Sequence, residues 1–396
     1  MEQLKIKLLM GPSESRNENF QLTCIEFLSK LGEKLGREMI CADMEEVSKQ
    51  PLPIYFVASG GAEGGFVNCY TQTKEPYILL STQEHNSLAA SMEIMGYLQE
   101  QGLRGEIIHG SFEVMAKRLK VFLRVAEAKR KLNGMKLGCF GMPDGLVASG
   151  ANFSAFSTAC KAEVFMIDTK ELLQEYQRGG YCENIYTESL KRKNFDRGEI
   201  ERALNVHGAL KRLIERYGLD GLTVKCFDLL DKVHTTGCLA LAILNAEGIP
   251  AACEGDQKSM ISMAVLHALT GQSGFMANPN SLDADKDEII FAHCTLPLDM
   301  PEHYELMSHF ESESSVAVSG DLKPQKLTVF KCNDTLEKFY VDGAELLETM
   351  HKSGLCRTQM RMRLEKGVEY FLRHPISNHH IICKGDWKDV IEEYFA

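Results

Sequence analysis

Short apolar runs alternate with amphipathic helical segments over residues 1–284 of the chain. Ile54–Ala58, Tyr77–Ser81 and Lys136–Phe140 are largely apolar, which is typical of strands buried on both faces of a sheet. Asn19–Leu35, in contrast, carries its apolar residues at helical spacing. Strands and helices that alternate in this way form parallel sheets covered by helices. The pattern therefore predicts two Rossmann-like α/β domains.

The pattern changes after the charged stretch Asp283–Asp287. Beyond it, short strand-like runs separated by turn residues predict an antiparallel β-barrel. We expect Gly274–Pro279 to be a loop and Asp283–Asp287 to be a linker. The predicted domains are an N-terminal α/β domain (1–134), a central α/β domain with metal-site acids (135–284) and a C-terminal β-barrel-like domain (285–396). The strands expected in the barrel include Glu288–His293, Lys326–Lys331, Met360–Leu364 and His380–Cys383.

Charge and cysteine content narrow the class of protein. A formal net charge of −11 disfavours binding to nucleic acid or to an anionic membrane surface, because both need a positive field. No apolar run approaches the roughly 20 residues of a membrane span. The 13 cysteines include no C-x-x-C pair, which is typical of reduced, buried thiols. We therefore expect a cytoplasmic protein without nucleic-acid or membrane partners.

Carboxylates follow two predicted strands of the central domain. Asp228 comes after Thr223–Phe227, and Glu254 comes after Pro250–Cys253. Because these strands are one strand–helix–strand repeat apart, their ends can meet at one edge of a sheet. Asp256 lies two residues further on, where it can serve equally as a second acid or as the cap of the next helix.

Asn278, His293 and the pair His379-His380 could join these acids around a divalent metal. Carboxylate and amide oxygens with imidazole suit Mn²⁺ or Mg²⁺ better than a thiolate-selected metal. Adjacent residues of a strand point to opposite faces, so only one of the two histidines can enter a given site. A thiol-dependent or zinc enzyme that uses Cys226, Cys253 or Cys294 is an alternative.

Two loops of the N-terminal domain follow predicted strands and could contact a small polar molecule. Ser59 and Gly60 lie in the first, and His85 and Asn86 lie in the second. The glycines could equally serve only a tight turn. Neither loop matches a dinucleotide or Walker motif.

Several runs of the chain together resemble the L-fucose isomerase / L-arabinose isomerase superfamily, in particular a shorter fucose-isomerase-like branch. The resemblance extends over most of the chain and is stronger from Thr223 onward. Ser59-Gly60-Gly61 and His85–Leu88 resemble the N-terminal domain of that branch. The other runs are Leu222–Leu230, Ala252–Asp256, Gly274–Pro279, Ala292–Thr295 and Asn378–Ile382.

This resemblance implies an Mn²⁺-dependent aldose–ketose isomerase that forms a homotrimer or homohexamer, with Mg²⁺ or Co²⁺ as alternative metals. It assigns Glu254 as metal ligand and proton-transfer group. The family's second acidic ligand falls on Asn278, which departs from the pattern because an amide cannot act as a base. The histidine ligand falls on His379-His380, of which we favour His380, and His293 resembles a further ligand.

Aldose–ketose isomerisation moves a proton between C1 and C2 through an ene-diol, so it needs a stabilised oxyanion and a base. With Asn278 excluded as a base, Asp228 or Asp256 is the best partner for Glu254. Arg357 could bind an anionic group such as phosphate or sulfonate, or it could be an ordinary ion-pair residue. The substrate is expected to be a hexose, deoxyhexose, pentose or anionic sugar. A sugar-binding protein that has lost turnover is the competing hypothesis, because of Asn278.

Overall fold

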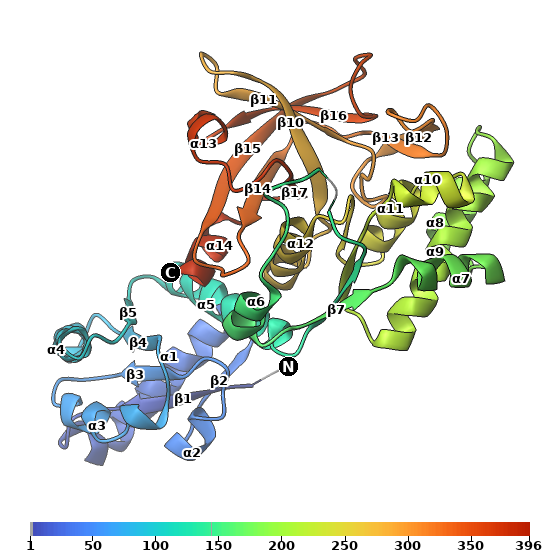
Figure 1. Ribbon diagram of the computed structural model, residues 1–396. Coiled ribbons are helices and arrows are strands. Elements are labelled where there is room, and N and C mark those ends of the chain that lie inside the picture. The colour runs from blue at the N-terminus through green and yellow to red at the C-terminus, as the bar shows by residue number, and fades with distance from the viewer. Residues whose placement is uncertain (1–2, 144) are drawn as a thin grey trace. The chain divides into compact units, whose positions relative to one another are not determined.

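The computed structural model of the protein describes residues 3–143 and 145–396 (Figure 1). The chain forms two compact units, Met1–Glu127 and Ala128–Ala396. The division into three domains at 134 and 284 stays a prediction.

The first unit contains a five-stranded parallel sheet with the strand order β2-β1-β3-β4-β5. Every residue of β3 and β4 is buried, as the apolar runs predicted. Helix α1 places Phe20, Cys24, Leu28 and Leu31 on one buried face and ends at Gly36, which takes the left-handed conformation. The strands are β1 (Gln3–Leu9), β2 (Glu38–Cys41), β3 (Ile54–Val57), β4 (Tyr77–Ser81) and β5 (Gly105–Ile108). The helices are α1 (Glu18–Leu35), α2 (Met44–Val47), α3 (Glu63–Val67), α4 (Ser87–Glu100) and α5 (Phe112–Leu132), which continues past Glu127.

The second unit begins with a four-stranded parallel sheet of order β7-β6-β8-β9. The expected strand Thr223–Phe227 is wrong in its bounds, because β8 ends at Val224 and Asp228 already begins helix α10. The strands are β6 (Lys136–Phe140), β7 (Glu163–Ile167), β8 (Gly221–Val224) and β9 (Ala251–Ala252). The helices are α6 (Phe153–Cys160), α7 (Thr169–Arg178), α8 (Ile185–Lys191), α9 (Arg197–Tyr217), α10 (Asp228–Val233), α11 (Cys238–Ala246) and α12 (Gln257–Thr270).

The same unit contains a closed antiparallel barrel of order β10-β11-β16-β15-β14-β17, as the sequence predicted. The expected loop at Gly274–Pro279 is instead the start of β10, which pairs with β11 and β17 and buries Phe275, Met276 and Ala277. The barrel strands are β10 (Phe275–Asp283), β11 (Glu288–His293), β14 (Lys326–Cys332), β15 (Phe339–Met350), β16 (Thr358–Leu364) and β17 (His380–Lys384). Outside the barrel are the hairpin β12 (His303–Met307) and β13 (Ala317–Asp321), and the helices α13 (Glu369–Arg373) and α14 (Lys388–Phe395).

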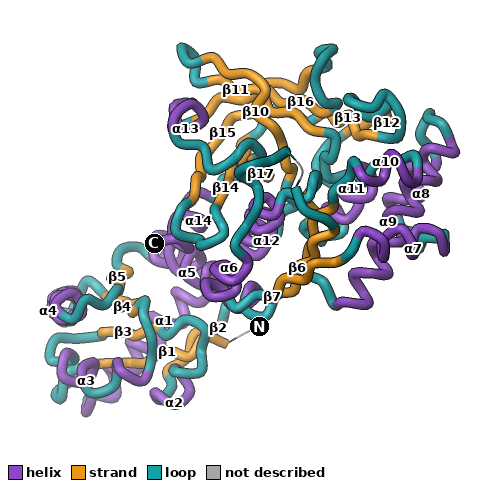
Figure 2. Tube along the Cα trace, viewed as in Figure 1, coloured by secondary structure: helices purple, strands orange, loops and turns teal. Residues whose placement is uncertain are grey.

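Helix α12 contacts both the parallel sheet and the barrel, through β8 and β9 on one side and β14 and β17 on the other (Figures 1 and 2). One buried apolar cluster continues from helices α9 and α11 into the barrel and includes Leu204, Ile243 and Phe291. Helices α9 and α11 and the barrel therefore share a core. The turn between β9 and α12 lies at the junction between the sheet and the barrel.

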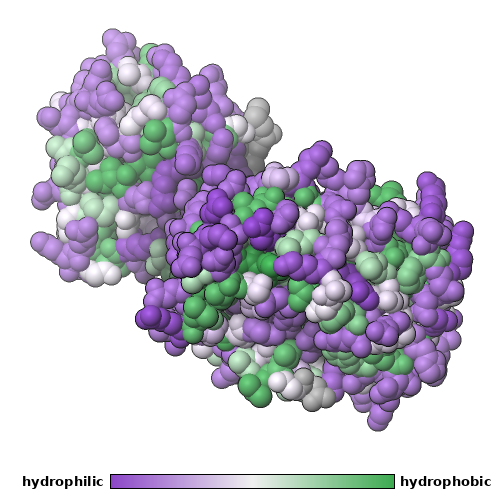
Figure 3. Space-filling view, turned by 90° about the horizontal axis from the view of Figure 1, so that it is seen from above, coloured by the Kyte–Doolittle hydropathy of each residue, from purple (hydrophilic) through white to green (hydrophobic). Residues whose placement is uncertain are grey.

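Hydrophobic residues form separate patches on the face drawn in Figure 3, and hydrophilic residues cover most of that face. Within 3–143 and 145–396, none of the helices combines the length and apolar character that a bilayer crossing requires.

Candidate active site

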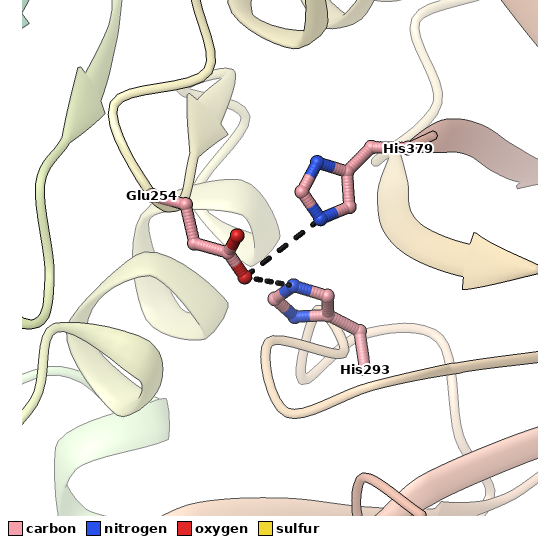
Figure 4. A group of neighbouring side chains, drawn as sticks. All are labelled: Glu254, His293 and His379. Carbon is pink, nitrogen blue, oxygen red and sulfur yellow. Dashed lines mark hydrogen bonds and ion pairs between the residues drawn. The ribbon is translucent and has the colours of Figure 1, made fainter. Parts of the chain in front are cut away.

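Glu254, His293 and His379 converge at the junction between the sheet and the barrel (Figure 4). Nε2 of His293 lies 3.3 Å from Oε1 of Glu254, and Nε2 of His379 lies 3.7 Å from the same oxygen. One ligand atom from each residue lies within 4.8 Å of the other two. Both histidines are buried, and Glu254 is partly exposed. The cluster therefore offers two imidazole nitrogens and a carboxylate to one point.

Glu254 reaches this point from a tight turn after β9. Its φ is 60°, and that of Gly255 is 66°, so two consecutive residues are left-handed. A non-glycine residue in this region is strained and is held by its surroundings. The Gly255 N–H donates to the carbonyl of Val224, which fastens the turn to the end of β8 (3.0 Å).

Each histidine is oriented through its Nδ1 atom. Nδ1 of His379 lies 2.9 Å from Oδ2 of Asp256, and Nδ1 of His293 lies 3.0 Å from Oγ1 of Thr295. The Asp256 carboxylate can only accept, so it favours the Nδ1–H tautomer of His379 and leaves the Nε2 lone pair of that ring directed toward Glu254. Hydrogen bonds of this kind to carboxylates and other oxygens orient most metal-binding histidines.

The residues present fit a divalent metal. Nε2 of His379 is buried and has no hydrogen-bond partner, which is costly unless another group binds it. Two imidazoles and a carboxylate suit first-row divalent ions, whereas Mg²⁺ prefers oxygen ligands. The cluster could therefore hold Mn²⁺ or Co²⁺ and leave coordination positions for substrate.

A buried ionic network lies behind His379. Asp256 caps helix α12 by accepting from the Ser259 N–H (2.7 Å), and it also bonds His379. The Lys331 ammonium donates to the Ser259 hydroxyl, which in turn donates to Asp256, each at 2.8 Å. Asp256 and Lys331 are both fully buried and their charged atoms are 3.9 Å apart. Asp256 thus serves as a helix cap and as a support for the site at once.

The charges of this network shift the pKa values of its carboxyl groups. Burial raises the pKa of Asp256, but the Lys331 ammonium and the hydrogen bond to His379 outweigh burial and hold the pKa well below its usual range. Burial likewise opposes ionisation of Glu254, yet the contacts with His293 and His379 lower its pKa. Both carboxyl groups are therefore ionised at neutral pH.

His380 does not join the cluster, although it was the favoured ligand. Its Nδ1 contacts the carbonyl of Asn378 (2.9 Å) and its Nε2 contacts the Tyr370 hydroxyl (3.1 Å). The ring packs against Phe371, and burial lowers its pKa to about 3. We therefore move the expected histidine ligand to His379, which points to the opposite side of the strand.

The remaining candidates in this unit are Asn278, Asp228 and Arg357, and each has its own contacts. Asn278 lines a small cavity with Glu254 and His293, and its Oδ1 accepts from Nδ2 of Asn378 (3.0 Å). Asp228 lies at the edge of an open pocket that Glu254 also lines, where it pairs with Lys225 (3.2 Å). The Arg357 guanidinium donates to the carbonyl and hydroxyl of Ser308.

Ser59, Gly60, His85 and Asn86 belong to the first unit. The Ser59 hydroxyl accepts from the Gly11 N–H (2.9 Å), and the Gly60 N–H donates to the carbonyl of His85 (2.8 Å). His85 lines a cavity of about 460 Å³ within that unit. The Gly60–His85 bond holds the two loops together at the carboxyl ends of β3 and β4, and the Ser59 contact ties the first loop to the segment after β1.

The cysteines of the thiol-enzyme alternative also lie near Glu254. Cys226, Cys253 and Cys294 are buried and line the small cavity. The neighbouring side chains of Cys253 and His309 hold the pKa of Cys238 well below its usual value. Although burial lowers the pKa of His309, its contact with Cys238 raises that pKa to about 9.

Two supporting residues were missed from the sequence. Lys331 lies on the same face of β14 as the apolar residues Leu327 and Val329. A lysine on an apolar strand face indicates a buried charge. Thr295 follows His293 by two residues and gave no comparable signal.

The chain is similar to curated proteins of known name, but no protein-family model matches it. It is 21% identical to a sulfoquinovose isomerase from Alkalicoccus urumqiensis over 272 residues, which are 64% of this chain and 61% of the relative. It is 25% identical to a sulfoquinovose isomerase from Clostridium sp. (strain MSTE9) over 190 residues, which are 46% of this chain and 42% of the relative. The chain thus spans about half the length of the curated relatives that it matches.

Replacing the buried cation tests the network behind His379. Lys331→Met leaves the Asp256 carboxylate buried without its neutralising charge, so we expect the free energy of unfolding to fall by about 3–5 kcal/mol at pH 7. Urea unfolding measures this loss. Lys323→Met is the matched control, because the ion pair of Lys323 with Glu302 is exposed and its removal should change stability little.

The same comparison has a defined pH dependence. The folded-state pKa of Asp256 lies below its unfolded value, so the stability from its ionisation is present above about pH 4 and is lost as the pH falls. The difference in free energy of unfolding between the wild-type protein and Lys331→Met should therefore become smaller below about pH 4. A difference in free energy of unfolding that is the same at every pH would contradict a charge-based role for Lys331.

Proposed function

We propose that the protein is a divalent-metal-dependent aldose–ketose isomerase that acts on a sulfonated hexose. The observation that carries this proposal is the convergence of Glu254, His293 and the unpartnered Nε2 of His379 on one point. The similarity to two proteins named sulfoquinovose isomerase supports the choice of reaction and substrate.

Glu254, His293 and His379 would hold the metal, for which we propose Mn²⁺. When bound, the ion supplies positive charge that stabilises the oxyanion developing at O1 and O2 of the sugar. Asn278 lies close enough to line the same cavity and is a further candidate ligand through its amide oxygen. Asp256 and Thr295 keep the two imidazoles oriented.

Glu254 is the proposed base that moves the proton between C1 and C2. Its carboxylate is ionised, lines an open pocket and is fixed by a strained turn, as expected of a positioned base. Asp256 is fully buried and committed to His379 and Ser259, so it is poorly placed to touch substrate. Asp228, at the edge of the same pocket, is the better candidate for the second proton-transfer group.

The open pocket beside Glu254 would receive the sugar. It has a volume of about 290 Å³ and is lined by Gly145, Lys225, Phe227, Asp228 and Glu254. Among the described residues that line this pocket, Lys225 carries the positive charge. Its side chain is 23% exposed. We therefore propose Lys225, and not Arg357, as the group that binds the sulfonate.

A sugar-binding protein without turnover is the second candidate function. It is favoured by Asn278, which cannot replace an acid in proton transfer and whose Oδ1 already accepts from Asn378. The proposals of a homotrimer or homohexamer and of a cytoplasmic location rest on the sequence alone.

Incubation of the purified protein with sulfoquinovose and Mn²⁺ in D₂O separates the two functions. We expect ketose formation with deuterium at C1 of the ketose, because the proton removed from C2 of the aldose exchanges with solvent on the base before a proton is delivered to C1. Glu254→Gln should lower kcat by at least about 100-fold, which is the scale of a lost general base. A ketose without deuterium would indicate hydride transfer, and binding without ketose would favour the sugar-binding function.

Lys225→Met tests recognition of the anionic group. A charge-assisted hydrogen bond to sulfonate contributes about 1.5–3 kcal/mol, so KM for sulfoquinovose should rise roughly 10- to 100-fold with little change in kcat. KM for an unsulfonated aldohexose should not rise. Arg357→Met is the matched control and should leave both KM values unchanged; the reverse pattern would restore Arg357 as the anion-binding residue.

A further inference from the structure

We propose that Cys226 and Cys253 are an oxidation site, at which hydrogen peroxide converts two thiols into a reversible disulfide beside Glu254. The Cys253 thiol donates to the sulfur of Cys226 across 2.9 Å. The two residues follow the neighbouring parallel strands β8 and β9, which pair through Thr223 and Ala252. None of the steps proposed for the isomerase uses either thiol.

The two sulfurs lie close enough to bond after a small movement. A disulfide needs a sulfur–sulfur distance of about 2.05 Å, so the two atoms must approach by roughly 0.9 Å. Both side chains are buried, since Cys226 and Cys253 are 2% and 3% exposed, so surrounding atoms limit how far either side chain can rotate. The turn that follows Cys253 must absorb part of this movement.

The surroundings favour a small oxidant. Both sulfurs belong to residues that line a cavity of about 20 Å³, which holds about one water molecule. Glu254 and Phe227 line this cavity and also the larger open pocket, so the two spaces are adjacent. Hydrogen peroxide is close to water in size and suits so small a cavity, whereas a glutathione disulfide is far too large.

The reaction balances with one peroxide per pair. The first thiol loses its proton and its sulfur attacks a peroxide oxygen, so the O–O bond breaks and water and a sulfenic acid form. The second thiol attacks that sulfur, the S–S bond forms and a second water leaves. Two thiols lose two electrons in total, and the peroxide gains them.

The disulfide would act on the site through Glu254. Cys253 immediately precedes Glu254, whose left-handed backbone depends on the fit of the turn. Drawing Cys253 toward Cys226 therefore displaces the carboxylate from His293 and His379. This consequence for metal binding and turnover rests on the proposed function, but the oxidation itself does not.

Peptide mapping of the full-length protein tests the site directly. Trypsin places Cys226 in fragment 226–232 and both Cys238 and Cys253 in fragment 233–258, and cleavage after Glu247 then separates Cys238 from Cys253. After treatment with hydrogen peroxide we expect fragment 226–232 linked to the fragment that contains Cys253. The link should disappear after reduction with a phosphine and should not form with glutathione disulfide.

Two variants complete the experiment. Cys226→Ser cannot form the link, so its activity and Mn²⁺ affinity should not change in peroxide. In the wild-type protein, peroxide should lower both activity and Mn²⁺ affinity at least tenfold, and reduction should restore them. Cys139→Ser, which removes another buried thiol from the neighbouring strand β6, should behave like the wild-type protein.

The outcomes distinguish the site from the proposed function. A link through Cys238, or sulfinic and sulfonic acids without any link, would overturn the oxidation site. A Cys226–Cys253 link that leaves Mn²⁺ binding unchanged would overturn its coupling to Glu254. If the reduced protein has no isomerase activity, the proposed function fails, while mapping and Mn²⁺ binding still decide the proposal on Cys226 and Cys253.

Discussion

The contact between Asp256 and His379 joins the two halves of the second unit at the point where the chemistry is expected. Asp256 caps helix α12 behind the parallel sheet, and His379 precedes strand β17 of the barrel. Lys331 of β14 balances the buried carboxylate from the barrel side. Removal of any one member leaves a buried charge or an unsatisfied polar atom, which the apolar surroundings make costly. The same contact directs Nε2 of His379 toward Glu254, so stability and site geometry depend on one interaction.

Much of the fold could be predicted because short buried strands, amphipathic helices and the change of pattern near Asp283 are local signals. Glu254 could also be predicted, since acids at the ends of parallel strands meet at one edge of the sheet. The start of β10 was missed. Its residues Phe275–Ala277 are a short apolar run of three residues. They pair with β17, which lies about 100 residues further along the chain, and the local sequence pattern does not indicate that pairing.

The choice between His379 and His380 could not be made from the sequence for the same reason. Strand alternation requires that the two rings point apart, but only closure of the barrel decides which ring faces Glu254. His380 instead packs with Tyr370 and Phe371. The partners of Asp256 were equally hidden, because Lys331 and His379 approach it from strands that are distant in sequence.

The binding of Mn²⁺ to His379→Gln and His380→Gln tests the central claim most directly, because the two substitutions are chemically identical and adjacent. Electron paramagnetic resonance of free Mn²⁺ gives the affinity of each folded variant without any assay of turnover. We expect His379→Gln to weaken Mn²⁺ binding at least about tenfold, the scale of a lost ligand or ligand support. His380→Gln should retain the affinity of the wild-type protein. Loss of binding in His380→Gln with retention in His379→Gln would contradict the site described for Glu254, His293 and His379.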